Sequence, residues 1–254
     1  STMSAVTMAG PMVSPSSAPD SPRRNQILAA LPQDVYARLH PHLERVPLQL
    51  GRSLYAPGEY QAYVYFPTAG IVSKRYTLED GATVDVAYIG NEGVVGVALF
   101  MGGNTFPLSA VVRNAGYGFR IKGSVLKLEF ERGGPLQNLF LLHTQALITQ
   151  MSQTVVCNRH HSVDQQLCRM LPLSLERGIS NALVMTQEQI ANMLGVRREG
   201  VTVAANHLQS VGLIHYRRGR VTVLDRPKLE ARVCECYAVV KRECSRLLPE
   251  ITAA

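Results

Sequence analysis

A stretch near the middle of the chain, from Pro135 to about Asn158, is apolar on nearly every side of a helix. Its apolar residues fall on two faces, one with Leu136, Leu139, Phe140, Leu147 and Met151, the other with Leu141, Leu142, Ala146, Ile148 and Val155. Such a helix must be covered on two sides. We expect one cover to be the N-terminal part of the chain and the other to be the same helix of a second copy. Burial inside one large domain is the alternative.

The sequence before this helix has the composition of a β domain. Twelve of the twenty glycines fall between Gly51 and Gly123, separated by short runs rich in valine, isoleucine, tyrosine and phenylalanine. Glu79-Asp80-Gly81 between two such runs is typical of a hairpin turn. Many short strands with regular turns predict an antiparallel sandwich or barrel, preceded by two short helices within residues 24–45.

The sequence after the helix predicts a small α domain with a hairpin. Helices are expected at Val163–Arg177, Thr186–Leu194 and Arg197–Val211, then two strands joined at Arg218-Gly219, then one last helix from about Arg226 to Leu248. The expected division is a Pro- and Ser-rich disordered tail (1–22), a β domain (23–134), a long helix (135–160) and the C-terminal domain (161–254). The fold class is α+β.

The most informative motif lies between Met185 and Leu208. Thr186 and Gln189 have the spacing of a capping box, which starts a helix. Gly195 suits the left-handed conformation that ends one. A second helix follows at once. Two helices joined by a turn containing glycine are typical of a helix-turn-helix, whose second helix reaches DNA bases.

The second helix begins with side chains suited to base recognition. Arg198 can donate to guanine O6 and N7, and Glu199 can accept from cytosine N4. Arginines of the following hairpin suit phosphates. The residues predicted to contact DNA are Thr186, Gln187, Arg197, Arg198, Glu199, Thr202, Asn206, Arg217, Arg218 and Arg220.

Positive charge is concentrated in the same region. The whole chain has a net charge of +7, and Thr186–Lys228 holds seven Lys/Arg against three Asp/Glu, a surplus of four. This favours a polyanionic partner. A protein-interaction domain with a basic face is the alternative. It explains the charge, but not the cap, the glycine and the arginine–glutamate pair together.

Other classes of protein find little support. Catalytic signatures such as Gly-x-Ser-x-Gly are absent from the sequence, and no histidine lies between Leu43 and Leu142, where a cupin metal enzyme needs them. We therefore expect no enzyme. No apolar run reaches about 18 residues, so no membrane partner is expected.

The five cysteines are an odd number in a long chain, which does not indicate a disulfide scaffold and favours a reducing cytoplasm. Cys234 and Cys236 are too close for the usual Cys-x₂-Cys zinc motif. Cys157, His160, His161 and Cys168 are ligand types, but adjacent histidines on a helix point in different directions. We expect packing cysteines, with no metal and no cofactor.

With these motifs, the sequence resembles the Crp/Fnr family of bacterial transcription regulators. The resemblance covers roughly Asn25–Asp225 and depends on Thr186, Gly195, Arg198 and Glu199. It implies a cyclic-nucleotide-binding-like β-roll (jelly-roll-like), a long dimerisation helix and a winged helix-turn-helix. The stretches Gly90–Gly96 and Cys157–Arg169 resemble a proteobacterial Crp-like group without a well-defined effector.

The resemblance also implies a homodimer that reads a two-fold-symmetric operator with half-sites about one helical turn apart. The residues predicted for the dimer helix are Phe140, His143, Leu147 and Met151. Many relatives carry Arg or Lys in the reading helix where this chain has Val203. Its operator therefore does not follow from theirs.

The effector site departs from the cyclic-AMP-binding members. Those carry a Gly-Glu pair for the ribose and an Arg-Ser pair for the phosphate, where this chain has Gly96-Val97 and Leu108-Ser109. Leu108 cannot neutralise a phosphate, and an uncompensated buried charge is costly. The effector pocket, if it takes a ligand, is expected to reject cAMP and cGMP.

Together these features predict a cytoplasmic, sequence-specific DNA-binding regulator of the Crp/Fnr type that does not respond to cAMP. Double-stranded DNA and a second copy of the chain are the expected partners, and RNA polymerase is a further candidate. The alternative is a small-molecule sensor whose C-terminal domain docks on a protein.

Overall fold

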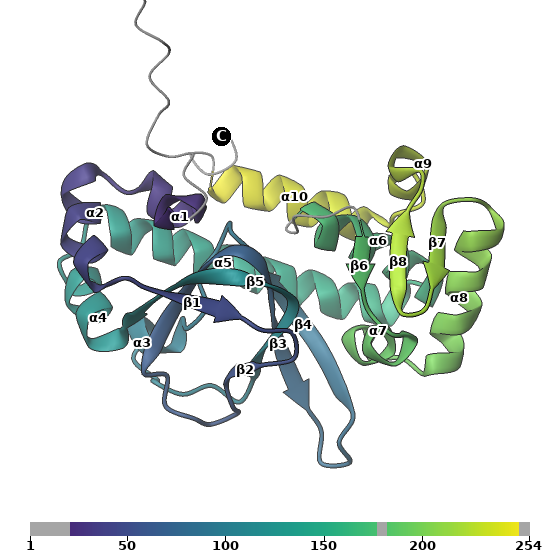
Figure 1. Cartoon of the computed structure of the whole chain (residues 1–254), viewed down its shortest axis with the longest axis horizontal. Coiled ribbons are helices and arrows are strands. Elements are labelled where there is room, and N and C mark those ends of the chain that lie inside the picture. Colours follow the sequence, from purple (N-terminus) through teal and green to yellow (C-terminus); the bar gives the residue numbers. More distant parts are fainter. Residues whose placement is uncertain (1–20, 177–181, 249–254) are drawn as a thin grey trace, which may run out of the picture.

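The computed structural model describes residues 21–176 and 182–248 (Figure 1). The predicted tail therefore lies outside the described residues, except for its last two. The described chain forms an N-terminal β domain, one long helix, and a C-terminal helical domain with a small sheet. The predicted α+β class is confirmed.

Short helices lead into the β domain: a 3-10 turn (Pro22–Arg24), α1 (Gln26–Ala30), α2 (Gln33–Leu39) and a second 3-10 turn (His40–His42). The fully buried Asn25 ties them to the sheet. Its side-chain oxygen accepts from the backbone N–H groups of Ile27 and Leu28, which caps α1. Its amide donates to the carbonyls of Pro67 and Gly93, at 2.9 and 2.8 Å. All four hydrogen-bonding positions of one side chain are thus used.

Five antiparallel strands form the β-roll: β1 (Glu44–Leu48), β2 (Ser53–Tyr55), β3 (Tyr63–Thr77), β4 (Thr83–Ile89) and β5 (Ser109–Lys122). Their order is β1-β5-β3-β4, with β2 also paired to β5. The strand β3 bends where its register with β5 shifts. Gly70 lies there with φ of 97°, and a Cβ on it would meet the carbonyl oxygen of Asn114 at 2.6 Å, so glycine is required. The predicted turn at Glu79-Asp80-Gly81 joins β3 to β4.

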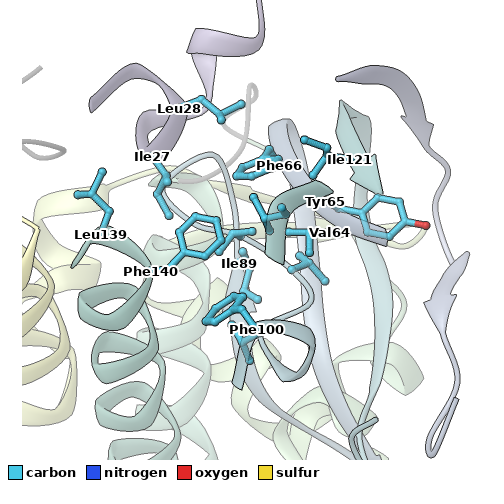
Figure 2. Close-up of a cluster of buried hydrophobic side chains, with 14 of the residues drawn as sticks. Ile27, Leu28, Val64, Tyr65, Phe66, Ile89, Phe100, Ile121, Leu139 and Phe140 are labelled. Atoms are coloured by element: carbon cyan, nitrogen blue, oxygen red, sulfur yellow. The ribbon is translucent and has the colours of Figure 1, made fainter. Parts of the chain in front are cut away.

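The long helix α5 (Pro135–His160) packs one face into the β-roll, with the short helices α3 (Ala98–Met101) and α4 (Gly123–Glu131) beside it. Figure 2 shows Phe140 of α5 directed toward Phe66 and Phe100. Their ring centroids lie 6.2 and 4.8 Å from that of Phe140, within the range of favourable aromatic pairs. The helix is therefore part of the β domain's own core.

The C-terminal domain has a separate hydrophobic core. It contains α6 (Val163–Glu176), β6 (Ala182–Val184), α7 (Gln187–Leu194), α8 (Arg198–Ser210), β7 (Ile214–Arg217) and β8 (Arg220–Val223). The strands pair in the order β6-β8-β7. The sequence did not reveal β6, because a three-residue edge strand shows too little alternation to be recognised.

The single last helix expected from about Arg226 to Leu248 is wrong. The structure has α9 (Arg226–Glu230) and α10 (Glu235–Leu247), separated by an extended Cys234 with ψ of 163°. The break lets α10 run back alongside α5 (Figure 1), which a straight continuation of α9 could not do. None of the helices in the described part of the chain combines the length and hydropathy that a bilayer crossing requires.

Candidate nucleic-acid interface

Helix α7 is held at its start by a complete capping box. The Thr186 hydroxyl accepts from the backbone N–H of Gln189 at 3.1 Å, and the Gln189 side chain accepts from the Thr186 N–H at 2.8 Å. Two of the helix's unsatisfied donors are thereby paired, which fixes where α7 begins. The capping box predicted from the sequence is confirmed.

The turn between α7 and α8 requires its glycine. Gly195 has φ of 65° and ψ of 36°, and its N–H donates to the carbonyl of Ala191. A Cβ at this position would also lie 3.0 Å from the Val84 side chain of β4. The helix-turn-helix therefore packs closely against the β3–β4 hairpin, a contact that the sequence gave no sign of.

Helix α8 separates an inner face from an outer one. Its buried residues are Val201, Ala204, Ala205 and Leu208. Arg198, Glu199 and Asn206 are exposed, as is Val203, which keeps 70% of its surface accessible. The positive end of the helix dipole lies at the first turn, beside the arginine–glutamate pair. The outer face thus exposes a cation, an anion, an amide and an apolar group.

Thr202, which the sequence predicts to contact DNA, makes hydrogen bonds within the helix pair. Its hydroxyl lies 2.6 Å from Oε1 of Gln187 and 3.1 Å from the carbonyl of Arg198. One of these bonds joins α8 to α7. Thr202 and Gln187, both predicted to contact DNA, therefore brace the two helices against each other.

The hairpin of β7 and β8 carries three arginines, Arg217, Arg218 and Arg220, which together form a basic wing. Arg218 and Gly219 have φ of 49° and 72°, the paired positive values of a type I′ turn. The wing is anchored through Tyr216, whose hydroxyl donates to the carbonyl of Met185 at 2.9 Å. Burial raises the pKa of Tyr216, and the nearby Arg198 opposes this rise. Arg217, Arg218 and Arg220 are exposed.

Residues 165–232 match the sequence model of the Crp-like helix-turn-helix domain. This part of the chain is a Crp-like helix-turn-helix domain. The match covers the capped α7, the glycine turn, the exposed tip of α8 and the arginine wing. No curated protein matches the chain.

The fold of the described residues is similar to that of solved Crp/Fnr regulators. One similar structure, from Eubacterium rectale, is described as a transcriptional regulator of this family; it shares 17% identity over 83% of this chain and 98% of that chain, with a TM-score of 0.65. FixK2 from Bradyrhizobium japonicum shares 17% identity over 76% and 98%, with a TM-score of 0.63. The c-di-GMP responsive regulator CLP of Xanthomonas campestris shares 18% over 76% and 100%, with a TM-score of 0.62.

The residues predicted for the dimer helix need correction. Phe140, His143 and Leu147 are buried inside their own protomer, and Met151 is half-buried. The Nε2 atom of His143 lies 3.1 Å from the carbonyl oxygen of Val94, so this side chain joins α5 to the β-roll. The sequence showed two apolar faces but could not tell which one the β-roll would cover.

The uncovered apolar side chains of α5 form a stripe. Leu141, Ile148 and Val155 keep 53%, 58% and 68% of their surface accessible. They are seven residues apart, which places them on one side of the helix, as in a coiled-coil seam. More than half of each of these side chains is therefore left uncovered by the described part of the chain.

The residues predicted for an effector pocket, Gly96, Val97, Leu108 and Ser109, are all buried. The strand next to them carries Lys74, also buried, whose ammonium donates to the hydroxyl of Tyr55 and lies 5.2 Å from the ring centre of Phe106. Burial lowers the pKa of Lys74 to about 8. This buried cation is thus already enclosed by aromatic side chains.

A second buried group of charged side chains lies on the same sheet. Arg113 donates to both carboxylate oxygens of Asp85, at 2.7 and 2.8 Å, and Arg75 lies 3.1 Å from the same carboxylate. Burial raises the pKa of Asp85, and Arg75 opposes this rise. The Arg113 guanidinium is thereby paired with Asp85.

Four further residues meet where α5 ends. Cys157, His161, Cys234 and Cys236 place their ligand-type atoms within 4.8 Å of one another. The sequence did not predict this group, because an unbroken last helix would have put Cys234 on a different face from Cys236.

Proposed function

We propose that the chain is a homodimeric, sequence-specific DNA-binding transcription regulator. The observation that carries the proposal is the exposed first turn of α8, where Arg198 and Glu199 project from a capped Crp-like helix pair. The side chain of each can bond one base edge in the major groove, Arg198 to guanine and Glu199 to cytosine. Val203, exposed on the same helix, suits apolar contact with a thymine methyl group.

The dimer proposal is supported by the stripe on α5. Leu141, Ile148 and Val155 leave apolar surface exposed on a helix whose other face is already packed. Burying such a stripe against its own copy would remove this surface from water. It would also set two Crp-like domains at a fixed separation, as a two-fold operator requires.

We further propose that cAMP is not the effector. The position that would neutralise its phosphate is Leu108, and Lys74 and Arg113 are enclosed by Tyr55, Phe106 and Asp85. A cyclic phosphate in this region would be a buried charge without a partner, which is costly. Isothermal titration of the dimer with cAMP should show no heat of binding; a stoichiometric binding isotherm would contradict this.

The DNA proposal is tested with a binding sequence selected from random duplexes on the wild-type protein. The double change Arg198→Ala/Glu199→Ala removes two base contacts, each of which discriminates by about 1–3 kcal/mol. We expect the affinity for the selected duplex to fall by roughly 100-fold or more in a mobility-shift titration, with the oligomeric state unchanged.

A matched control is the double change Lys127→Ala/Glu131→Ala, which removes one cation and one anion from exposed positions of α4. It should leave the affinity unchanged. If no sequence can be selected, or if the double change in α8 has no effect, the domain does not read DNA through α8 and the protein-docking alternative is favoured.

A further inference from the structure

A group of three thiols and one imidazole lies at the junction of the two domains. Cys157 is in the last turn of α5, and His161 directly follows this helix, its N–H donating to the carbonyl of Cys157 at 3.0 Å. Cys234 caps the start of α10 and Cys236 is in that helix's first turn. Two helix ends, 77 residues apart in sequence, therefore bring the four side chains together.

The spacing of these atoms fits a tetrahedral metal site. The sulfur atoms of Cys157 and Cys234 are 3.7 Å apart, and the Cys236 sulfur lies 3.5 Å from Nδ1 of His161. With Zn–S of about 2.3 Å and Zn–N of about 2.1 Å, the edges of a zinc tetrahedron are about 3.8 Å for S···S and about 3.6 Å for S···N. The remaining pairs lie within 4.8 Å, so closing the site requires shifts of about 1 Å.

The imidazole is oriented as a metal ligand usually is. Its Nε2 atom lies 3.4 Å from the carboxylate of Glu235, while Nδ1 faces the sulfur of Cys236. A carboxylate that accepts from one ring nitrogen leaves the lone pair of the other free for a metal. Glu235 is placed for this because it is the residue between the two cysteines of α10.

The surroundings enclose three thiols next to positive charge. Cys157, Cys234 and Cys236 are buried and form a cluster of their own, separate from both hydrophobic cores. The N-terminus of α10 brings the positive end of its dipole to Cys234 and Cys236. The guanidinium of Arg169 is a positive charge that acts on the Cys157 sulfur and favours its deprotonated form. Three thiolates, one neutral imidazole and a divalent ion leave one negative charge, which Arg169 lies close enough to offset.

We propose that Cys157, His161, Cys234 and Cys236 bind one zinc ion per chain. Three sulfurs and one nitrogen complete a four-coordinate shell, which is the composition of structural rather than catalytic zinc sites. Three cysteine protons leave as the thiolates form, so binding weakens as the pH falls. The ion would join the end of α5 to the start of α10, at the point where the long helix leads into the Crp-like domain.

The test uses the full-length protein, purified under reducing conditions, with its metal content measured by elemental analysis. We expect about one zinc per chain, and its removal by a chelator should lower the thermal unfolding temperature. After chelation, Co²⁺ should restore one equivalent of the visible absorption typical of tetrahedral thiolate-bound cobalt. None of these readouts depends on DNA binding, so they can fail while the proposed function stands.

Variants separate this site from general thiol binding. Cys157→Ser, Cys236→Ser and His161→Ala should each abolish stoichiometric zinc and the cobalt spectrum. Cys244→Ser is the matched control, since Cys244 lies in α10 outside the group and the change should retain both. Equal loss in Cys244→Ser would overturn the assignment.

A measurement on the wild-type chain covers the case in which a variant does not fold. Zinc should slow the alkylation of three of the five cysteines, which peptide mass analysis would identify as Cys157, Cys234 and Cys236. Alkylation rates that zinc leaves unchanged would contradict the proposal. So would a Cys157–Cys234 disulfide without metal, which would make the pair a redox site.

Discussion

Lys74 is a charged side chain in a buried, largely apolar place. It is a lysine enclosed in the β-roll between β2, β5 and the ring of Phe106, with its pKa lowered by burial to about 8. A buried amine of this kind costs free energy as long as it must carry a charge. Its hydrogen bond to Tyr55 and the two aromatic rings offset only part of that cost.

We therefore predict that Lys74→Met stabilises the protein at pH 7. The native pKa of about 8 lies below the unfolded value of 10.5. The unfolded chain thus binds more protons between these values, and wild-type stability rises with pH across this window. The gain in Lys74→Met should be up to about 3 kcal/mol at pH 7 and should shrink toward pH 10.

Urea unfolding of the two proteins at both pH values measures this. Lys127→Met, at a half-exposed position of α4, serves as the control and should change stability by less than about 0.5 kcal/mol. A loss of stability in Lys74→Met at pH 7 would show that the contacts of the lysine outweigh its desolvation.

Among the elements, α5 has two faces with different surroundings. One face carries Phe140 and His143 into the β-roll, and the other leaves Leu141, Ile148 and Val155 exposed. Because both faces belong to one rigid helix, a change in the β-roll core can move the surface offered to a second copy. In the proposed dimer, α5 would thus connect a change in the N-terminal domain to the Crp-like domains.

The stripe gives a prediction at the scale of this element. Ile148→Glu would place a charge at the centre of a helix–helix contact, where burying it unpaired is costly. We expect light scattering to show monomers, and the affinity for the selected duplex to fall at least tenfold. Leu128→Glu, at an exposed leucine of α4, should leave the dimer intact. A wild-type chain that is monomeric at micromolar concentration would contradict the dimer proposal.

At the scale of the whole molecule, positive charge is unevenly distributed over the surface. The net charge is +7, and the wing and the tip of α8 carry Arg197, Arg198, Arg217, Arg218 and Arg220 at exposed positions. Each phosphate that a cation neutralises releases counterions, so binding should weaken steeply as salt increases.

We predict that replacing the three wing arginines by glutamine flattens this salt dependence. In a dimer the slope of log affinity against log salt should decrease by up to about 5, because six phosphate contacts are lost at about 0.9 ion each. The triple variant Arg24→Gln/Arg52→Gln/Arg132→Gln, with the same charge change at exposed positions of the N-terminal domain, should keep the wild-type slope. An unchanged slope in the wing variant would mean that the wing does not contact phosphate.

Sequence reasoning succeeded where structure is set by neighbouring residues. The capping box of Thr186 and Gln189, the left-handed Gly195, and the turns at Gly81 and Gly219 each follow from the conformational preferences of a few adjacent residues. The proposed base-reading pair, Arg198 and Glu199, likewise rests on the start of a single helix and stays a prediction. For the same reason the order of β domain, long helix and helix-turn-helix could be read before the structure was known.

Only the tertiary structure decided which surfaces meet. It turned Phe140 and His143 inward and Ile148 outward, and it broke the last helix so that Cys234 joined Cys157. The period of a helix says that a face is apolar, but not what covers it, because its cover comes from residues distant in sequence. Local conformational preferences can therefore be predicted from the sequence. Contacts between distant segments cannot, because they depend on how all the segments pack together.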